Sequence, residues 1–290
     1  MVLQELAQTL IDAVLAGGAR VLEVQRRGSI GARYKDATEL VTEADAESDA
    51  AMLSALQARL PSIDPAICVE LEESGLTGVR ERRRVGADPL DGTSHFACGG
   101  NLYAVQAHYI EDDVPLVGVV LQPEVFLLQG IDDRPAGRLV WAVRGEGAQV
   151  RRTDFVDGAF QLGAARPVVK RPQPETRTFI GCVPTTGKMT PEERALARRV
   201  HDSGLLGGMT GTGGAAGNVM MTIFGGQQVY CNFGAGDELD IAPGQVIAQE
   251  AGLTVWGSDR RPPAWSVRKQ PVVFAPDDEI AERFLRAAGL

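Results

Sequence analysis

The strongest constraint on the fold is a change of hydrophobic pattern along the chain. Apolar and polar residues alternate over residues 103–143 as they do in antiparallel strands, whereas strand-like and helix-like segments follow one another after residue 178. Two helical patterns come first, at Leu3–Val24 and Asp45–Leu60, and Pro61 is expected to end the second. Because sheets bury their faces against helices, this order predicts a layered α/β (α+β) fold rather than a bundle.

The expected elements fall into two groups. In the first group we expect strands at Tyr103–Ile110, Pro115–Gln122, Val125–Gln129 and Leu139–Val143, with Pro123 as a break. In the second group, strands are expected at residues 178–183, 227–231, 253–256 and 271–275, and helices after Thr190 and at residues 213–224, 239–251 and 277–288. A Pro- and Arg-rich passage lies between the groups and predicts two halves, residues 1–165 and 166–290.

Composition narrows the class of protein. The net charge of −9 argues against nucleic acid or an anionic membrane as a partner, because both attract Lys and Arg. Neither a signal peptide nor a transmembrane run is expected, and four widely spaced cysteines fit buried reduced thiols in a cytoplasmic protein. An acidic protein with an anionic substrate needs positive charge at its site, and metal ions are the obvious source.

The segment Asp88-Pro89-Leu90-Asp91-Gly92-Thr93 is the most informative stretch for chemistry. Two carboxylates three positions apart, with proline between them, suit a tight turn in which both side chains converge. Gly92 leaves bare backbone for a ligand, and Thr93 offers a hydroxyl and an N–H group. A helix that began here would present free N–H groups to a phosphate, although a simple capped turn before a helix also fits the pattern.

Three further acidic positions accompany that segment. Glu72 and Glu73 follow an apolar run at the end of a predicted strand, Asp45 lies at a helix start where Asp is also a common cap, and Asp240 opens a late helix. Carboxylate oxygens with few histidines are the ligands that Mg²⁺ prefers, and two adjacent metal ions can stabilise both oxygens of an in-line phosphoryl displacement.

Taken together, Asp45, Glu72-Glu73-Ser74, the segment Asp88–Thr93 and Leu239-Asp240 resemble the inositol monophosphatase family over nearly the whole chain. The family comprises lithium-sensitive, magnesium-dependent phosphomonoesterases. The resemblance implies an α/β/α/β/α sandwich and a homodimer that hydrolyses inositol monophosphate or a related sugar or polyol phosphate. Alternatives are 3′(2′),5′-bisphosphate nucleotidase activity, fructose-1,6-bisphosphatase-type activity, and a non-catalytic binding protein on the same scaffold.

The resemblance also implies a role for each matching residue. Two or three Mg²⁺ ions, with Mn²⁺ as a substitute, would be bound by Glu72, Asp88, the Leu90 carbonyl, Asp91 and Asp240. Glu72 and Thr93 would orient a metal-activated water, with Asp45 accepting a hydrogen bond from Thr93, and Lys35 would add positive charge nearby. Substrate contacts would come from Gly92, Thr93, Gly213, Gly214, Ala215 and Asn232.

The sequence departs from the family pattern at a few positions. Leu239 stands where a tryptophan is expected, which threatens the local geometry of Asp240, and Asn232 lies near the place of a glutamate that reads sugar hydroxyls. His95 fits either a substrate contact or a capped helix. The run Arg82–Arg84 is interpreted as a solvated loop.

Overall fold

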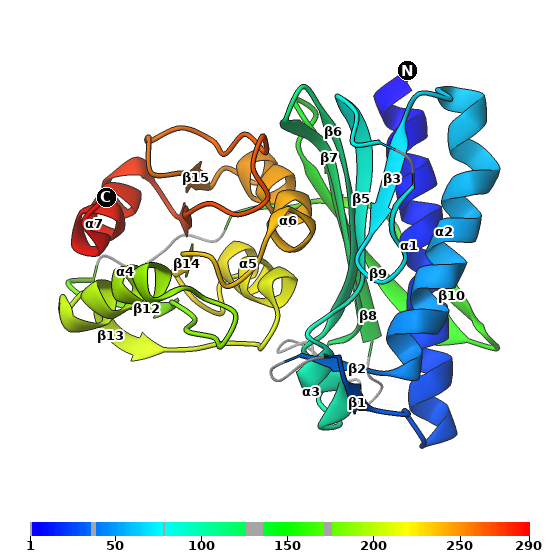
Figure 1. Ribbon diagram of the computed structural model, residues 1–290, viewed down its shortest axis with the longest axis horizontal. Coiled ribbons are helices and arrows are strands. Elements are labelled where there is room, and N and C mark those ends of the chain that lie inside the picture. The colour runs from blue at the N-terminus through cyan, green and yellow to red at the C-terminus, as the bar shows by residue number, and fades with distance from the viewer. Residues whose placement is uncertain (1, 36–38, 78, 126–135, 171–175) are drawn as a thin grey trace.

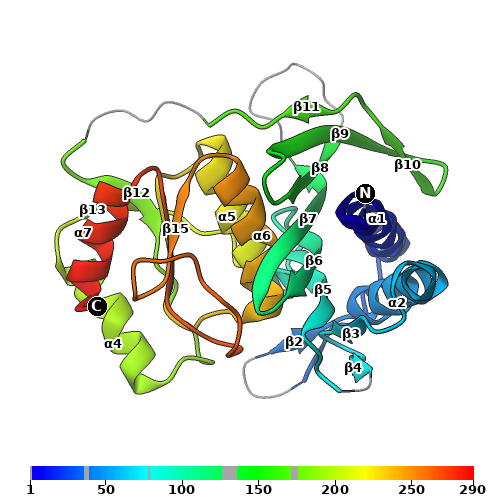
Figure 2. The same cartoon turned by 90° about the horizontal axis from the view of Figure 1, so that it is seen from above.

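The structure is a computed structural model that describes residues 2–35, 39–77, 79–125, 136–170 and 176–290. Its helices and sheets form five alternating layers (helix, sheet, helix, sheet, helix), which Figure 1 shows edge-on and Figure 2 shows from above. The predicted layered α/β sandwich is therefore confirmed.

The larger sheet lies between two helical layers. Its strands are β3 (Cys68–Leu71), β4 (Gly75–Thr77), β5 (Arg83–Asp91), β6 (Ala104–Glu111), β7 (Val114–Val125), β8 (Ala136–Val143), β9 (Ala148–Val156), β10 (Ala159–Leu162) and β11 (Arg166–Pro167). They run in the order β10-β9-β8-β7-β6-β5-β3-β4, and β11 also pairs with β9. Neighbours from β5 to β9 are antiparallel, whereas β3 and β5 are parallel.

The smaller sheet belongs to the second half of the chain. It runs in the order β13-β12-β14-β16-β15, with β12 (Phe179–Cys182), β13 (Leu206–Met209), β14 (Val229–Asn232), β15 (Thr254–Trp256) and β16 (Val272–Ala275). Helices α4 (Pro191–Asp202) and α7 (Asp278–Ala288) cover its outer face, and α5 (Ala215–Phe224) and α6 (Glu238–Glu250) separate it from the larger sheet. The division at residue 165 stays a prediction, since β11 lies just beyond it yet pairs with β9.

Helices α1 (Val2–Arg27) and α2 (Glu43–Ile63) lie side by side on the far face of the larger sheet. Gly17 of α1 permits a close approach, because a Cβ atom there would lie 2.6 Å from Ser48 Oγ of α2. The outward face of α1 is polar, and no helix in the described part of the chain has both the length and the apolar character needed to cross a membrane.

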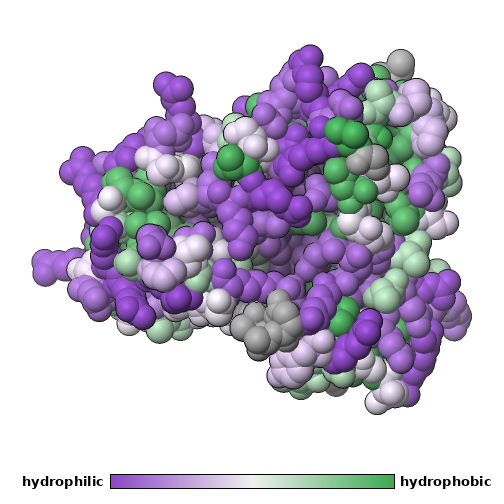
Figure 3. All heavy atoms as spheres, viewed as in Figure 1, coloured by the Kyte–Doolittle hydropathy of each residue, from purple (hydrophilic) through white to green (hydrophobic). Residues whose placement is uncertain are grey.

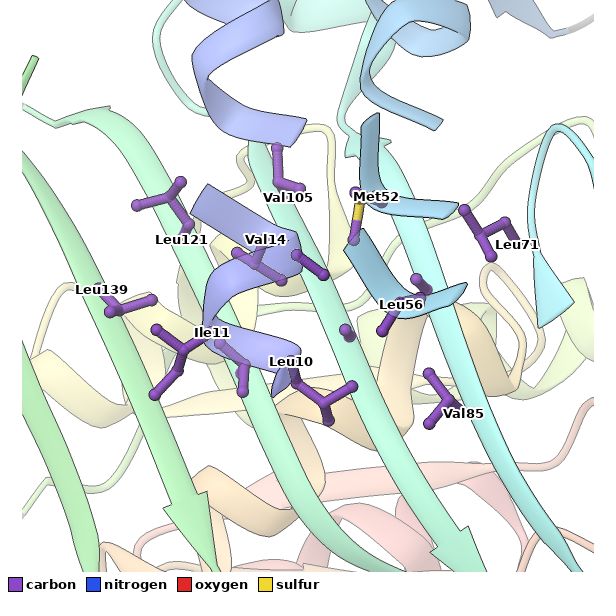
Figure 4. Packing of buried hydrophobic residues seen from close by; sticks show 14 of the residues in the cluster. Leu10, Ile11, Val14, Met52, Leu56, Leu71, Val85, Val105, Leu121 and Leu139 are labelled. Carbon is purple, nitrogen blue, oxygen red and sulfur yellow. The ribbon is translucent and has the colours of Figure 1, made fainter. Parts of the chain in front are cut away.

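The main apolar core lies between these two helices and the larger sheet. Figure 4 shows Leu10 and Val14 of α1 and Met52 and Leu56 of α2 above the sheet, where all four are buried. Burial of such side chains stabilises the fold by about 1.5–3 kcal/mol each. Strand β5 thus has one face in this core, and its other face is available to α6.

Two prolines do not end their elements as predicted. Pro61 lies inside α2, which continues to Ile63 because the Asp64 N–H donates to the Leu60 carbonyl at 2.9 Å and keeps the last turn closed. Pro123 lies inside β7, at an irregularity in its pairing with β8 where the missing N–H is tolerated. The rest of the strand predicted at 125–129 falls outside the described residues.

Sequence reasoning also missed elements in the first half. Strands β9 and β10 were not predicted, and Arg82–Arg84 is not a solvated loop, because β5 begins at Arg83 and Arg84 is buried. The guanidinium of Arg84 pairs with Glu238 of α6. A partner 154 positions away leaves no local pattern that would distinguish a buried arginine from a solvated one.

Candidate active site

Strand β5 ends in the acidic segment. Its pairing with β6 is regular as far as Asp88, which lies opposite Gln106, and then shifts before Asp91, which lies opposite Ala104. Such an irregularity re-aims side chains and ends the ladder. The Leu90 N–H donates to Asp88 Oδ1 at 2.9 Å, so the turn expected from the sequence is closed by its own first carboxylate.

Three aspartates converge at the end of this strand. Asp88, Asp91 and Asp240 each offer a carboxylate oxygen, and the three oxygens lie within 4.8 Å of one another. Asp240 comes from the first turn of α6, where its Oδ2 accepts a hydrogen bond from the Asp237 N–H at 2.7 Å. The structure therefore brings together ligands predicted from two distant parts of the sequence.

Glu72 joins this cluster from the end of β3. Its N–H donates to the Ala87 carbonyl at 3.1 Å, and its side chain lines the same cavity as Asp88. Burial, and then repulsion by Asp240, raises the pKa of Glu72 to about 7, and burial together with repulsion by Glu72 raises the pKa of Asp88 well above its usual value. Four mutually repelling oxygen ligands fit a hard divalent cation such as Mg²⁺.

Asp91 is held by the N-terminus of α5. Its two carboxylate oxygens accept hydrogen bonds from the N–H groups of Ala215 at 2.8 Å and Ala216 at 3.0 Å. Gly214 leaves room for this contact, since a Cβ atom there would lie 2.3 Å from Asp91 Oδ2. Ala215 was predicted to contact substrate, and although it lines the cavity, its N–H is already donated to Asp91.

Thr93 and Asp45 form a hydrogen-bonded pair beside the cluster. Thr93, the first residue of the short helix α3 (Thr93–Ala97), donates from Oγ1 to Asp45 Oδ1 at 2.9 Å. The other oxygen of Asp45 accepts from the backbone and side chain of Thr42, the N-cap of α2, which follows the short hairpin of β1 (Arg33–Tyr34) and β2 (Leu40–Val41). Gly92 precedes Thr93 with φ +89°, a left-handed conformation that glycine adopts without strain.

These groups line one side of a cavity of about 470 Å³, and residues 182–188, 209–211 and 213–215 line the other side. Gly213 and Gly214 are among them, together with Thr185, Thr186 and Thr210. A volume of this size is typical of small-molecule sites. Figure 3 shows hydrophilic residues gathered over the middle of the molecule, between its two halves.

Two lysines bring positive charge to the site. Lys35 lies 3.8 Å from Glu72 and pairs with Glu73, in agreement with its expected position near the site. Lys188 lines the cavity and pairs with Glu39, which precedes β2, at 2.7 Å. Lys188 was not predicted from the sequence, because a lysine in the loop before the Thr190 cap looks like any surface lysine.

Asn232 is not brought to the cavity, which corrects its prediction as a substrate contact. Its side chain is fully buried, and its Oδ1 accepts hydrogen bonds from the N–H groups of Gly234, Ala235 and Gly236, with Ala235 at 2.7 Å. The amide therefore shapes its own loop. His95 packs beside Gly213, where a Cβ atom would lie 2.3 Å from its ring.

A layered α/β fold with carboxylates converging on a polar cavity is typical of phosphoric monoester hydrolases that use metal ions. The family model for the inositol monophosphatase family matches residues 2–289. The chain belongs to the inositol monophosphatase family.

Individual relatives match a smaller part of the chain than the family model does. An inositol-1-monophosphatase from Synechocystis sp. is 36% identical over 129 residues, which are 42% of this chain and 41% of that protein. A histidinol-phosphatase from Mycobacterium tuberculosis is 32% identical over 150 residues, 52% of this chain and 51% of that protein. The match thus spans about half the length of these relatives or less.

A solved structure, the extragenic suppressor protein suhB from Bartonella henselae, superimposes with a TM-score of 0.71. It is 20% identical, and the superposition covers 97% of each chain. At that identity the likeness supports the fold alone.

Proposed function

We propose that the protein is a magnesium-dependent phosphatase that hydrolyses a small phosphate monoester. The observation that carries this proposal is the convergence of Asp88, Asp91 and Asp240, with Glu72 beside them, next to the Thr93–Asp45 pair. Bound Mg²⁺ would neutralise the phosphate dianion and lower the pKa of the attacking water. In the proposal, Glu72, the three aspartates and the Leu90 carbonyl hold two or three such ions, and Mn²⁺ can substitute.

The chain's own groups would then position the reactants. Gly92 and Thr93 present backbone N–H groups at the cavity for the phosphate oxygens. The Thr93 hydroxyl donates its own proton in the hydrogen bond to Asp45, so its oxygen would accept a hydrogen bond from the attacking water and orient that water together with Glu72. As the water loses its proton to Thr93 Oγ1, the Thr93 proton would pass to Asp45.

We infer that the alcohol part of the substrate is a polyol or sugar, with inositol monophosphate as the leading candidate. Thr185, Thr186 and Thr210 line the cavity, and such polar residues suit a partner with several hydroxyl groups. A phosphate-release assay should compare inositol 1-phosphate, fructose 1,6-bisphosphate, histidinol phosphate and adenosine 3′,5′-bisphosphate. Turnover of none of them would argue for a binding protein, and preference for the last would favour a nucleotidase.

A homodimer and sensitivity to Li⁺ are part of the same proposal. Sedimentation equilibrium of the purified chain tests the dimer, and a single species with the 30.9 kDa mass of one chain would contradict it.

We expect Li⁺ to inhibit uncompetitively or noncompetitively against substrate. Asp88, Asp91 and Asp240 would hold a cation that has to leave together with product phosphate, and Li⁺ held there would supply half the charge of Mg²⁺ while the phosphate is still bound. Inhibition should weaken as Mg²⁺ is raised, and excess Mg²⁺ should itself slow product release, so that the rate passes through a maximum. Initial rates over a grid of both cations test this, and indifference to molar Li⁺ would contradict it.

Asp45→Asn is expected to lower kcat by about 10–100-fold, as for other residues that orient a metal-site group. The amide keeps one acceptor oxygen for the cap of α2 but loses the charge that acts on Thr93. Glu193→Gln is a matched control, because Glu193 occupies the same position in the capping box of α4 and lies outside the carboxylate cluster. Equal kcat losses in the two variants would mean that Asp45 acts only as a cap.

A further inference from the structure

A buried cluster of charges joins α6 to the larger sheet next to the carboxylate cluster. Arg84 of β5 donates to Glu238 of α6 through Nε to Oε1 at 2.9 Å and through Nη2 to Oε2 at 3.1 Å. His108 of β6 places Nε2 at 3.3 Å from Oε1 of the same carboxylate, and Arg80 pairs with it as well. The side chains of Arg84 and Glu238 are only 3% and 2% exposed, so this pair is isolated from solvent.

Arg84 is fixed on its remaining sides. Its Nη2 also donates to the Trp265 carbonyl at 2.7 Å, and its Nη1 donates to Asp113 Oδ1 at 3.1 Å. The Trp265 N–H in turn donates to the Asp113 carbonyl at 2.7 Å. Because a guanidinium donates in a rigid plane, these contacts leave the Arg84–Glu238 pair one orientation.

The pair lies close in sequence to the proposed metal ligands on both elements. Arg84 shares β5 with Asp88 and Asp91, and Glu238 shares the first turn of α6 with Asp240. Strand β5 and helix α6 are in close contact between the ion pair and the aspartates.

Gly86 of β5 permits that contact, because it has no side chain. A Cβ atom at Gly86 would lie 2.3 Å from His108 Cε1 and 2.7 Å from Leu239 Cδ2. Leu239 is the residue that departs from the expected tryptophan, so a compact leucine and a bidentate ion pair hold α6 on β5 here.

We propose that Arg84 and Glu238 are positioning residues for the metal site, and that their pair sets where Asp240 lies relative to Asp88 and Asp91. The inference rests on the proposed function, since it takes the three aspartates as cation ligands. Neither residue lines the cavity, so both act through the backbone of β5 and α6. Residues that orient metal ligands typically change metal affinity by about 10–100-fold when replaced, and a loss in that range is expected here.

The test measures Mn²⁺ binding by the electron paramagnetic resonance signal of the free ion, which needs no substrate. Glu238→Gln keeps the shape of the side chain and removes its charge. The double variant Arg84→Met/Glu238→Leu removes the whole pair, and apolar replacement of a buried ion pair is often neutral for folding. Leu10→Ala is the control, because it creates a cavity on the far side of the larger sheet from α6 and destabilises the fold without touching the pair.

Both pair variants should bind Mn²⁺ at least tenfold more weakly than the wild type, whereas Leu10→Ala should lower the melting temperature but keep the Mn²⁺ affinity. Unchanged Mn²⁺ affinity in Glu238→Gln, or in a folded double variant, would overturn the positioning role. An equal loss of affinity in Leu10→Ala would also overturn it, because affinity would then follow stability alone. A wild type that binds no Mn²⁺ would instead contradict the proposed function.

Discussion

Removal of divalent cations is expected to abolish phosphate release and to lower the melting temperature. The carboxylates of Glu72, Asp88, Asp91 and Asp240 lie close together and repel one another, and no side chain of the cluster itself can replace a cation as the partner of the phosphate dianion. A cation that binds only the folded state stabilises it by about 2.7 kcal/mol at a hundred times its dissociation constant. Rates and thermal melts should be measured after chelation and dialysis, and again with Mg²⁺ or Mn²⁺ restored.

The two readouts separate the possible failures. Full activity after exhaustive chelation would contradict the proposed chemistry. Recovery of the melting temperature with Mg²⁺, but no turnover of any phosphate ester, would leave a cation-binding protein on this scaffold.

The second large effect is expected from Asp91→Asn, which should lower kcat by more than about a hundredfold. Replacement of residues that merely orient a metal ligand costs about 10–100-fold, and Asp91 is proposed to contact the ion itself. The amide would also place its NH₂ group against the N–H of Ala215 or Ala216, where Asp91 now accepts.

Asp237→Asn is the matched control for this substitution. Asp237 is equally close to the cluster in sequence, but it caps α6 by accepting from the Leu239 N–H at 2.9 Å, and asparagine caps helices equally well. Its kcat should stay within a few-fold of the wild type. Comparable losses in the two variants would identify Asp237, rather than Asp240, as the ligand from α6.

The acidic segment could be located from the sequence because its functional side chains are close together along the chain. Asp88, Asp91 and Thr93 lie within one turn, so their convergence follows from local geometry, and the Thr190 cap likewise predicted the start of α4 correctly. Asn232 could not be judged in this way. Whether an amide faces a ligand or its own backbone depends on how the following loop folds. Here three N–H groups of that loop donate hydrogen bonds to Asn232 Oδ1.

Pairs between distant segments were beyond local reasoning. In the sequence Arg84 looks like part of a solvated basic run, but in the structure it pairs with Glu238 of α6. Lys188 likewise looks like an ordinary loop residue, but it pairs with Glu39. Hydrophobic periodicity also did not predict β9 and β10. These strands lie near one edge of the larger sheet, and β9 contains polar residues and two arginines. Burial in these cases is decided by tertiary contacts that follow no sequence period.

The division of ligands between layers has a consequence for how the protein folds. Asp88 and Asp91 come from the larger sheet, whereas Asp240 comes from a helix that packs between the two sheets. Contacts between segments so far apart in the chain tend to form late in folding, because closing a long loop costs entropy before the contact can contribute stabilising free energy. The three aspartates therefore come together only where α6 is packed on the larger sheet, so a chain in which that contact has not formed lacks one of the three proposed cation ligands.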